Sequence, residues 1–301
     1  MPVQCAFLYN KYVLALVCSC ITAASTTEQT DLKIILLVMK ISVIGAGAMG
    51  GAMVEGFVKS GMLAASDITV SAPHETTLER FKSLGVSVTT DNKVAAAAGD
   101  IVFVVVKPWL AEQVINEIKP VIDYSRQTVA SVMAGISSSK LKEMLAGEDG
   151  LLPRMFIVIP NIAIAVKSSM TFIVPVNAAK EDTTAMSALF EATGGQMVIE
   201  ERQLGAATAL ASCGIAYAMR YVRAASEGGV ELGFKARDAQ KIVMQTMKGA
   251  VDLLQANGSH PEDEIDKVTT PGGLTIRGLN EMEHAGFTSA VIRGLKAGMS
   301  K

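Results

Sequence analysis

The feature that most constrains the fold is the stretch 40–51, which reads K-I-S-V-I-G-A-G-A-M-G-G. Its apolar first half is typical of a buried strand, and Gly45, Gly47 and Gly50 follow with the spacing G-x-G-x-x-G. In this spacing the first glycine permits a tight strand-to-helix turn, the second lets the backbone approach a pyrophosphate, and the third allows the helix to pack closely on the strand. Because free N–H groups at a helix N-terminus bind phosphate oxygens, the stretch predicts a dinucleotide site. The alternative is a strand–helix turn that binds no ligand.

Strand-like and helix-like segments then alternate as far as residue 199. Short apolar runs at 68–71, 85–89, 101–106, 128–132, 155–159, 171–174 and 197–199 indicate strands, and helical patterns separate most of them. The run at 101–106 is apolar throughout, as in a parallel strand that is buried on both faces. The alternation predicts an α/β domain over 39–199, built as a Rossmann-type doubly wound parallel sheet.

The pattern changes from residue 200 onward. Long helical patterns follow at about 203–228, 236–255 and 276–299, with a loop at 257–273 between the second and the third. We therefore expect an all-helical dimerisation domain over 200–301. Helices this apolar need more partner surface than about 100 residues can supply, so a homodimer or larger homo-oligomer is expected.

Composition limits the partners of the chain. With 301 residues there is room for two domains, and the net charge of −2 without a long basic run argues against nucleic acid. Three of the four cysteines lie in the first twenty residues, which leaves Cys213 alone in the body. A lone cysteine fits a reducing compartment, so we expect a cytoplasmic protein. No His/Cys set has the spacing of metal ligands, and no metal is expected.

The first 38 residues are interpreted separately. Residues 12–24 are mostly apolar, follow Lys11 and end in small residues, so they loosely resemble a signal peptide. They are too few for a membrane-spanning helix, which needs about 20 apolar residues, and no membrane partner is expected. Met39 and Lys40 open the first strand as an ordinary start would. We interpret residues 1–38 as an extension from a mis-assigned upstream start, with a targeting segment as the alternative.

The end of the second strand indicates the cofactor. An enzyme that prefers NAD usually places Asp or Glu there to bind the ribose 2′-hydroxyl, whereas here Ser71 is followed by Ala-Pro-His, with no acid before Glu75. Since a carboxylate would repel a 2′-phosphate, we expect NADP, with NAD possible. The predicted cofactor-binding residues are Gly45, Gly47, Ala48, Met49, Gly50, Ser71, Asn92, Val106, Lys107, Pro108, Ala134, Gly135 and Asn161.

Three of these predictions have simpler alternatives. Lys107 follows a strand at its carboxyl end and either neutralises a phosphate or is a solvated lysine. Ala134 and Gly135 permit close approach of a cofactor or only a turn. Asn161 offers a donor and an acceptor to a nicotinamide amide or a substrate, or merely caps a turn.

The helical half carries the most specific motif. Residues 269–292 read T-T-P-G-G-L-T-I-R-G-L-N-E-M-E-H-A-G-F-T-S-A-V-I, which resembles the signature of the Δ1-pyrroline-5-carboxylate reductase family. The similarity extends to G-A-G-A-M-G-G at Gly45, V-K-P at Val106, the Pro-Asn pair at Pro160 and E-G-G-V at Glu227. It covers residues 39–301.

The resemblance implies hydride transfer from NAD(P)H to the C=N bond of pyrroline-5-carboxylate, the last step of proline biosynthesis. In the family, active sites form where the dinucleotide domain of one subunit meets the helical domains of an interleaved dimer. Thr275 matches the family threonine that hydrogen-bonds the ring nitrogen and is predicted to be catalytic. A helix that begins after Gly272 and Gly273 would offer N–H donors to the substrate carboxylate. The predicted substrate-binding residues are Thr269, Thr270, Gly272, Gly273 and Cys213.

Two motifs depart from the family pattern. The family's Pro-Asn-Thr-Pro is here Pro-Asn-Ile-Ala at 160–163, and its Gly-Ser-Gly-Pro-Ala-Tyr is here Ser-Cys-Gly-Ile-Ala-Tyr at 212–217. Cys213 thus takes the place of a family serine and either touches substrate or is an inert small residue. The Pro-Gly-Gly turn with Thr275 also has a purely structural alternative, a tight turn and helix cap.

Two other functions stay open at this stage. One is another NADP-linked reductase of the β-hydroxyacid dehydrogenase type, although the G-x-x-x-K-x-x-N-N run of those enzymes is absent. The other is a non-catalytic NADPH-binding subunit, which the two altered motifs would suit.

Overall fold

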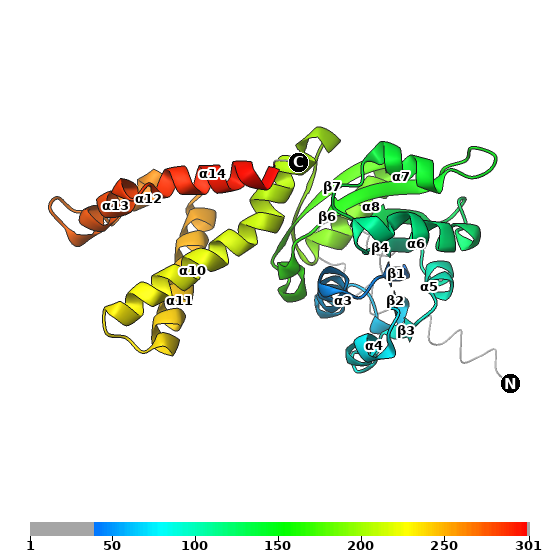
Figure 1. Ribbon diagram of the computed structural model, residues 1–301, viewed down its shortest axis with the longest axis horizontal. Coiled ribbons are helices and arrows are strands. Elements are labelled where there is room, and N and C mark those ends of the chain that lie inside the picture. The colour runs from blue at the N-terminus through cyan, green and yellow to red at the C-terminus, as the bar shows by residue number, and fades with distance from the viewer. Residues whose placement is uncertain (1–38, 300–301) are drawn as a thin grey trace, which may run out of the picture. The chain divides into compact units, whose positions relative to one another are not determined.

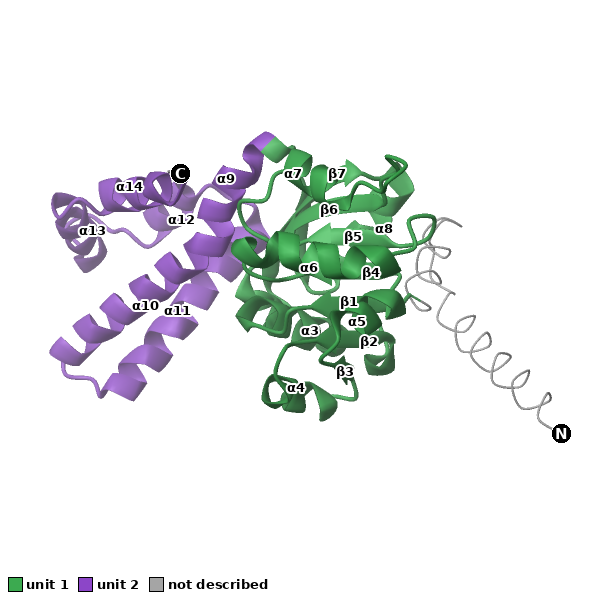
Figure 2. Cartoon of the chain, turned by 45° about the vertical axis from the view of Figure 1, so that its right-hand side comes forward, with its two compact units in different colours: residues 1–201 green, residues 202–301 purple. Residues whose placement is uncertain are grey.

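The computed structural model describes residues 39–299, so the predicted N-terminal extension lies outside the described residues. The chain divides into two compact units, 1–201 and 202–301, which Figure 2 colours separately. Within residues 39–299, no helix combines the length and the apolar character needed to cross a bilayer.

Unit 1 is built on one eight-stranded sheet with the strand order β3-β2-β1-β4-β5-β6-β7-β8 (Figure 1). The strands are β1 (Ile41–Ile44), β2 (Ile68–Ser71), β3 (Ser87–Thr89), β4 (Ile101–Val104), β5 (Thr128–Ser131), β6 (Arg154–Ile159), β7 (Ser169–Asn177) and β8 (Gly194–Val198). From β3 to β6 all neighbours are parallel, with Val43 of β1 in register with Val70 of β2 and Phe103 of β4. This confirms the predicted doubly wound sheet.

One strand departs from the predicted all-parallel arrangement. β7 runs antiparallel to β6, with Ile157 paired to Val174. The short connection between them holds only a 3-10 helix, η4 (Ile162–Val166), whereas a parallel return needs a crossover of about a dozen residues or more. The next connection contains the helix α8 (Lys180–Glu191), and β8 accordingly pairs parallel with β7.

Helices cover both faces of this sheet. In Figure 1, α3 and α4 lie on one face of the β1–β3 half and α5 on the other, with α6 beside α5 near β4. The α-helices are α3 (Ala48–Ser60), α4 (Glu75–Lys82), α5 (Asn92–Ala98), α6 (Ala111–Ile118) and α7 (Ser138–Leu145), and the 3-10 helices are η1 (Ala65–Asp67), η2 (Pro108–Leu110), η3 (Lys119–Val121) and η5 (Glu201–Gln203). Capping side chains fix several helix starts: Asp91 accepts from two N–H groups of α5, and Ser137 accepts from the Lys140 N–H in α7.

Three phenylalanines hold α3 against the sheet. Phe57 of α3, Phe103 of β4 and Phe190 of α8 are fully buried, and their ring centroids are 5.6–5.8 Å apart. Aromatic pairs at this spacing contribute about 0.5–1.5 kcal/mol beyond the burial of their area. The core therefore fixes the helix whose N-terminus follows the glycine stretch.

Unit 2 is helical. Its elements are α9 (Leu204–Ala207), η6 (Thr208–Cys213), α10 (Gly214–Glu231), α11 (Ala236–Asn257), α12 (Pro261–Lys267), α13 (Leu274–His284) and α14 (Phe287–Met299). The predicted helix at 203–228 is wound partly as α-helix and partly, in η6, as a π-helical segment. The predicted helix at 276–299 is in fact two helices, because Gly286 has a φ of 82°, a left-handed conformation that ends α13.

The prediction of a loop over 257–273 was wrong for the middle of that range, where α12 lies. Pro261 occupies the first turn of this helix, and the His260 side chain accepts a hydrogen bond from the Glu262 N–H. Three acidic residues follow in the first turn, where they complement the helix dipole. The polar sequence of the segment had concealed these helix-start signals.

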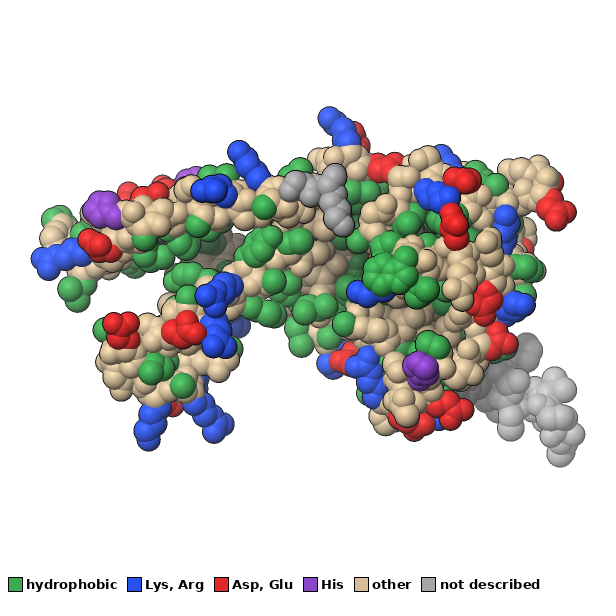
Figure 3. All heavy atoms as spheres, in the orientation of Figure 1, with side chains coloured by type: hydrophobic (Ala, Val, Ile, Leu, Met, Phe, Trp, Pro, Cys, Tyr) green, Lys and Arg blue, Asp and Glu red, His purple; other side chains and the backbone are tan. Residues whose placement is uncertain are grey.

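Unit 2 has almost no apolar interior of its own. Among its described residues the only buried hydrophobic side chains are those of Ala207, Ala209 and Ala239. In contrast, Leu232 and Leu274 are 83% and 84% exposed, and Figure 3 shows hydrophobic side chains gathered on its helices. The helices α10 and α11 approach closely at Gly229, where an added Cβ would lie 2.9 Å from the Ala239 Cβ. This close approach gives the E-G-G-V motif a packing role.

Candidate active site

The carboxyl ends of the parallel strands meet at one edge of the sheet, and backbone hydrogen bonds join the segments that leave them. The Gly45 N–H donates to the Ser71 carbonyl over 3.0 Å, and the Val105 N–H donates to the Ile44 carbonyl over 2.8 Å. From β1 the chain adds β2 and β3 on one side of β1, and it then returns to add β4 on the other side. The direction in which strands are added therefore reverses between β1 and β4. Ligands of open α/β sheets bind at such a point.

All thirteen predicted cofactor-binding residues lie at or after these carboxyl ends. They are Gly45, Gly47, Ala48, Met49 and Gly50 after β1, Ser71 at the end of β2, Asn92 after β3, Val106, Lys107 and Pro108 after β4, Ala134 and Gly135 after β5, and Asn161 after β6. The fold thus brings residues from six separate segments of the sequence to one edge.

The glycine turn (residues 45–50) has the shape that a pyrophosphate requires. Gly45 has a φ of 104°, and a Cβ there would lie 2.4 Å from the Val105 carbonyl oxygen. A Cβ on Gly50 would lie 1.9 Å from the Gly45 oxygen. Gly47 instead faces open space among the described residues and caps α3 with no side-chain hydrogen bond to its first turn. The N–H groups of that turn are therefore open to phosphate oxygens, and the chain fits a dinucleotide here.

Ser71 is fully buried, and its hydroxyl has a protein partner. Its Oγ donates to Asn92 Oδ1 over 2.8 Å, and Asn92 Nδ2 donates in turn to Glu117 Oε2 over 2.9 Å. This chain of bonds ties the end of β2 to α5 and α6. Since the hydroxyl proton already bonds Asn92, Ser71 does not have it to give to a cofactor phosphate. Glu117 was not predicted, and no local pattern in its helix marks it.

The segment after β4 presents two exposed side chains. Lys107 Nζ lies 6.0 Å from the centroid of the Trp109 ring, a long cation–π contact, and Trp109 is 77% exposed. After β5, Ala134 and Gly135 form an exposed turn. Trp109 was not among the predicted site residues, although it directly follows the Lys-Pro pair that was.

Asn161 acts as a cap in this structure. Its Oδ1 accepts from the Ala163 N–H over 3.0 Å, at the start of η4, and its own N–H donates to Ser169 Oγ over 3.1 Å. Its side chain is 9% exposed. The capping alternative is thus realised, and a contact with the nicotinamide stays a prediction.

In unit 2, four of the five predicted substrate-binding residues form a corner at the start of α13 (the substrate corner, residues 269–275). Thr275 is exposed in the first turn, and Gly273 caps the helix with no side-chain hydrogen bond. The Gly273 N–H donates to the Thr270 carbonyl over 2.9 Å. The Thr269 hydroxyl is directed back to α12, where it donates to the Ile265 carbonyl over 2.7 Å. The corner therefore offers first-turn N–H groups and the Thr275 hydroxyl.

The chain before this corner is held by Glu264. Its carboxylate accepts from Lys267 Nζ over 2.7 Å, from Ser259 Oγ over 2.5 Å and from Asn257 Nδ2 over 3.1 Å. These three bonds, the lysine first, lower the pKa of Glu264 to about 2. Sequence reasoning missed this residue because it lay in a segment that was expected to be a loop.

Cys213 lies elsewhere in unit 2, at the end of η6. A Cβ added to Gly298 would be 3.9 Å from its Sγ, and the nearby Tyr217 hydroxyl donates to the Gly294 carbonyl over 3.4 Å. Cys213 thus packs toward α14, whereas the substrate corner belongs to α12 and α13. Over residues 39–299, no three His, Cys, Asp or Glu side chains cluster as metal ligands would.

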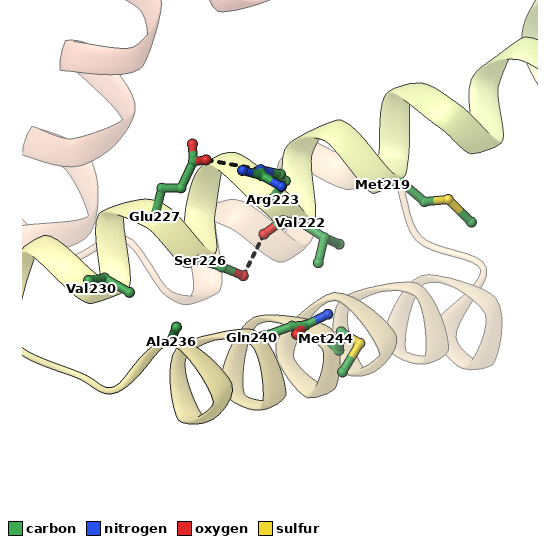
Figure 4. Close-up of a pocket in the computed structure, with 9 residues that line it drawn as sticks. All are labelled: Met219, Val222, Arg223, Ser226, Glu227, Val230, Ala236, Gln240 and Met244. Atoms are coloured by element: carbon green, nitrogen blue, oxygen red, sulfur yellow. Dashed lines mark hydrogen bonds and ion pairs between the residues drawn. The ribbon is translucent and has the colours of Figure 1, made fainter.

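A groove between α10 and α11 of unit 2 contains none of the predicted substrate residues (Figure 4). It is lined by Met219, Val222, Arg223, Ser226, Glu227, Val230, Ala236, Gln240 and Met244. Its polar contacts join residues of the same helix: Arg223 Nε donates to Glu227 Oε1 over 3.0 Å, and Ser226 Oγ donates to the Val222 carbonyl over 2.7 Å. Since these groups already bond one another, we assign no substrate to this groove.

A glycine turn at the reversal point of a mostly parallel sheet, followed by a helical unit, defines the class of two-domain dinucleotide-binding proteins. Comparison with known proteins makes the class specific. Residues 201–301 match the family model for pyrroline-5-carboxylate reductase dimerisation, and residues 40–135 match that for coenzyme F420-dependent NADP oxidoreductases. The chain belongs to the pyrroline-5-carboxylate reductase family.

Several relatives carry that family's name. Pyrroline-5-carboxylate reductase 2 of Dictyostelium discoideum is 36% identical over 85% of this chain and 89% of its own length. The corresponding enzyme of Methanosarcina acetivorans is 35% identical over 84% and 94%. Pyrroline-5-carboxylate reductase 1 of D. discoideum is 38% identical over 87% of this chain, which spans only 49% of that relative.

Solved structures agree with these relatives. The pyrroline carboxylate reductase of Plasmodium falciparum, with NADP bound, superposes with a TM-score of 0.78 at 25% identity, over 88% of this chain and 97% of that one. The enzyme of Streptococcus pyogenes gives 0.75 at 28% identity, over 87% and 96%.

Proposed function

We propose that the chain reduces 1-pyrroline-5-carboxylate to L-proline with NADPH as the hydride donor, and with NADH as a possible substitute. The observation that carries the proposal is the open glycine turn in a chain that also keeps the family's Pro-Gly-Gly-x-Thr corner. Relatives with 35–36% identity over most of their length are named for this reaction. The P. falciparum structure has NADP bound.

The carboxyl edge of unit 1 would hold the dinucleotide. The N-terminus of α3 and the backbone of the glycine turn bind the pyrophosphate, and the segments after β4, β5 and β6 line the rest of the cofactor. Bound there, NADPH supplies the hydride. Orienting the two reactants can contribute about 7–11 kcal/mol to lowering the barrier, so the work of the chain is largely to position them.

The substrate corner would hold the cyclic imine. The N–H groups after Gly272 and Gly273, together with the dipole of α13, bind the substrate carboxylate. The Thr275 hydroxyl donates a hydrogen bond to the ring nitrogen, which gains basicity as the hydride reaches the neighbouring carbon. Thr269 and Thr270 lie in this corner and are assigned to the surroundings of the substrate. Cys213, which packs toward α14, keeps its assignment only as a prediction.

Assembly and location complete the proposal. We propose a homodimer or a larger homo-oligomer. Among the described residues of unit 2 the buried hydrophobic side chains are three alanines, and large apolar side chains stay exposed when the chain is alone. We place the protein in the cytoplasm, because Cys213 is a free thiol without an internal partner in the described chain.

The test is NADPH oxidation with pyrroline-5-carboxylate by the wild type and by Thr275→Ala. Losing one hydrogen bond to a group that gains charge should lower kcat/KM about 10- to 100-fold, and Thr275→Ser should restore most of it. Thr246→Ala is the matched control, because this exposed threonine of α11 only bonds its own helix.

Three outcomes would contradict the proposal. Turnover of hydroxyacids without turnover of the imine would indicate the hydroxyacid dehydrogenase type. NADPH binding without any turnover would indicate a non-catalytic subunit. A higher kcat/KM with NADH than with NADPH would refute the expected cofactor preference.

A further inference from the structure

Arg80 of α4 reaches across to the first turn of α3, beside the glycine turn. A Cβ added to Gly51 would lie 2.0 Å from Arg80 Nη2, and the same nitrogen is 3.5 Å from the Ala46 carbonyl oxygen. The guanidinium therefore occupies the room that Gly51 leaves by having no side chain. This gives a reason for the fourth glycine of the stretch, which the G-x-G-x-x-G spacing does not require.

The guanidinium is placed but not saturated by its neighbours. Arg80 Cζ lies 4.5 Å from the centroid of the Phe81 ring, and Phe81 is fully buried. Glu55 Oε1 is 3.7 Å from Nη1, beyond hydrogen-bond distance. An arginine has five N–H donors, and the contact to Ala46 is at the long limit for one of them. The side chain is 51% exposed, so a ligand can reach it from the solvent.

Basic side chains that follow other strands at this edge are placed less favourably for the glycine turn. Lys93 follows β3, which lies two strands away from β1. Lys107 follows β4 and lies over Trp109, on the other side of the point where the strand order reverses. Ser71, which was expected to favour NADP, donates its hydroxyl hydrogen bond to Asn92 Oδ1. Arg80 is thus a permanent positive charge that contacts the stretch 45–51.

We propose that Arg80 binds a phosphate of the dinucleotide beside the glycine turn and that this arginine, in place of Ser71, supplies the charge for cofactor binding. The inference rests on the proposed function and deepens it. Arginine binds phosphate through paired N–H donors, and these charge-assisted bonds are stronger than neutral ones. Glu55, with its Oε1 3.7 Å from Nη1, pairs with the guanidinium electrostatically and leaves N–H donors for the phosphate.

The test measures dissociation constants by titration calorimetry for Arg80→Gln and for Gly51→Ala. Arg80→Gln should raise the Kd of NADPH about 10- to 100-fold. Gly51→Ala keeps the arginine but should displace its guanidinium, so the NADPH Kd should rise in the same direction by a smaller factor. Thermal unfolding of both variants checks that unit 1 keeps its fold.

Arg126→Gln is the matched control. Arg126 is 49% exposed and pairs with Asp100 at the opposite, amino edge of the sheet, so its loss should leave the NADPH Kd unchanged. The proposed ligand of Arg80 is either the 2′-phosphate or the pyrophosphate of the dinucleotide. Titrations with NADH and with the fragments adenosine 2′,5′-bisphosphate and AMP distinguish the two. A loss confined to the 2′-phosphorylated ligands assigns Arg80 to the 2′-phosphate, whereas an equal loss for NADPH and NADH assigns it to the pyrophosphate.

An unchanged NADPH Kd in a folded Arg80→Gln would overturn this inference alone. If the wild type binds neither NADPH nor NADH, the proposed function itself falls. The two failures are therefore distinguishable by the wild-type titration.

Discussion

Two single-methyl substitutions in the glycine turn separate its structural role from its binding role. A methyl on Gly50 points at the Gly45 carbonyl oxygen, which would be 1.9 Å away, and that carbonyl belongs to a turn already pressed against Val105. A methyl on Gly47 points into open space. The added methyl should therefore lower the stability of the protein at Gly50 and its affinity for the cofactor at Gly47.

The magnitudes follow from the geometry. Overpacking costs typically about 1–3 kcal/mol, and an approach of 1.9 Å to a backbone oxygen belongs in the upper half of that range. Replacing a helical glycine by alanine returns about 1 kcal/mol, so Gly50→Ala should destabilise unit 1 by about 1–2 kcal/mol. For a unit of this size, that corresponds to a fall in Tm of about 2–8 °C. Gly47 has a φ of −68°, which alanine adopts freely. The Tm of Gly47→Ala should therefore fall by only about 2 °C, because alanine is a poorer N-cap than glycine.

The assay pairs thermal unfolding without cofactor with NADPH titration. Gly47→Ala should bind NADPH about tenfold or more weakly, because its methyl occupies the space that the pyrophosphate needs. The reasoning is refuted if Gly50→Ala melts like the wild type, or if Gly47→Ala binds NADPH normally. A Gly47→Ala protein that melts well below Gly50→Ala would reverse the two roles.

Two further predictions concern stability and assembly. The Glu201 carboxylate accepts hydrogen bonds from the Ser138 hydroxyl and, over 2.7 Å, from the Ser138 N–H. These bonds lower the pKa of Glu201 below the ordinary carboxyl value of 4.5. The stabilisation they give is therefore present above pH 4.5 and is lost as the pH falls through the lower pKa of the folded state. Glu201→Gln should therefore lower the free energy of unfolding by about 1–2 kcal/mol at neutral pH and by progressively less in acid. The control, Glu148→Gln at an exposed site, should leave the free energy of unfolding unchanged. A loss for Glu201→Gln that grows in acid would contradict this reasoning. Ile292→Asp places a charge on the apolar surface of α14 and should lower the mass measured by light scattering to that of smaller species. Leu151→Asp, at a 60% exposed site of unit 1, should leave the mass unchanged, and an unchanged mass for both variants would show that α14 is not an interface.

Local sequence signals predicted much of the fold and the location of the cofactor edge. The run Ile101–Val104 is apolar at every position because it is buried on both faces, and G-x-G-x-x-G marks the turn because each glycine meets a separate local restriction. Once the strands are parallel, their carboxyl ends must share an edge, so residues as distant as Gly45 and Asn161 are assigned to that edge by strand order alone. The one wrong strand direction, that of β7, depended on the length of a connection.

The contacts between segments were not predictable in this way. Hydrogen bonding from Ser71 through Asn92 to Glu117 joins three elements, and no periodicity within any one of them records the others. Arg80 reads as an ordinary charged residue of α4 until the packing of α4 beside α3 brings it to Gly51.

The sequence by itself determined the order of elements, the glycine turn and the Pro-Gly-Gly corner, because turns, caps and periodicity depend on neighbouring residues. Only the tertiary structure decided which polar side chains have already used their hydrogen bonds and which charge reaches the turn. Those outcomes depend on distances between residues that are far apart in the chain, and such distances exist only once the helices have packed on the sheet.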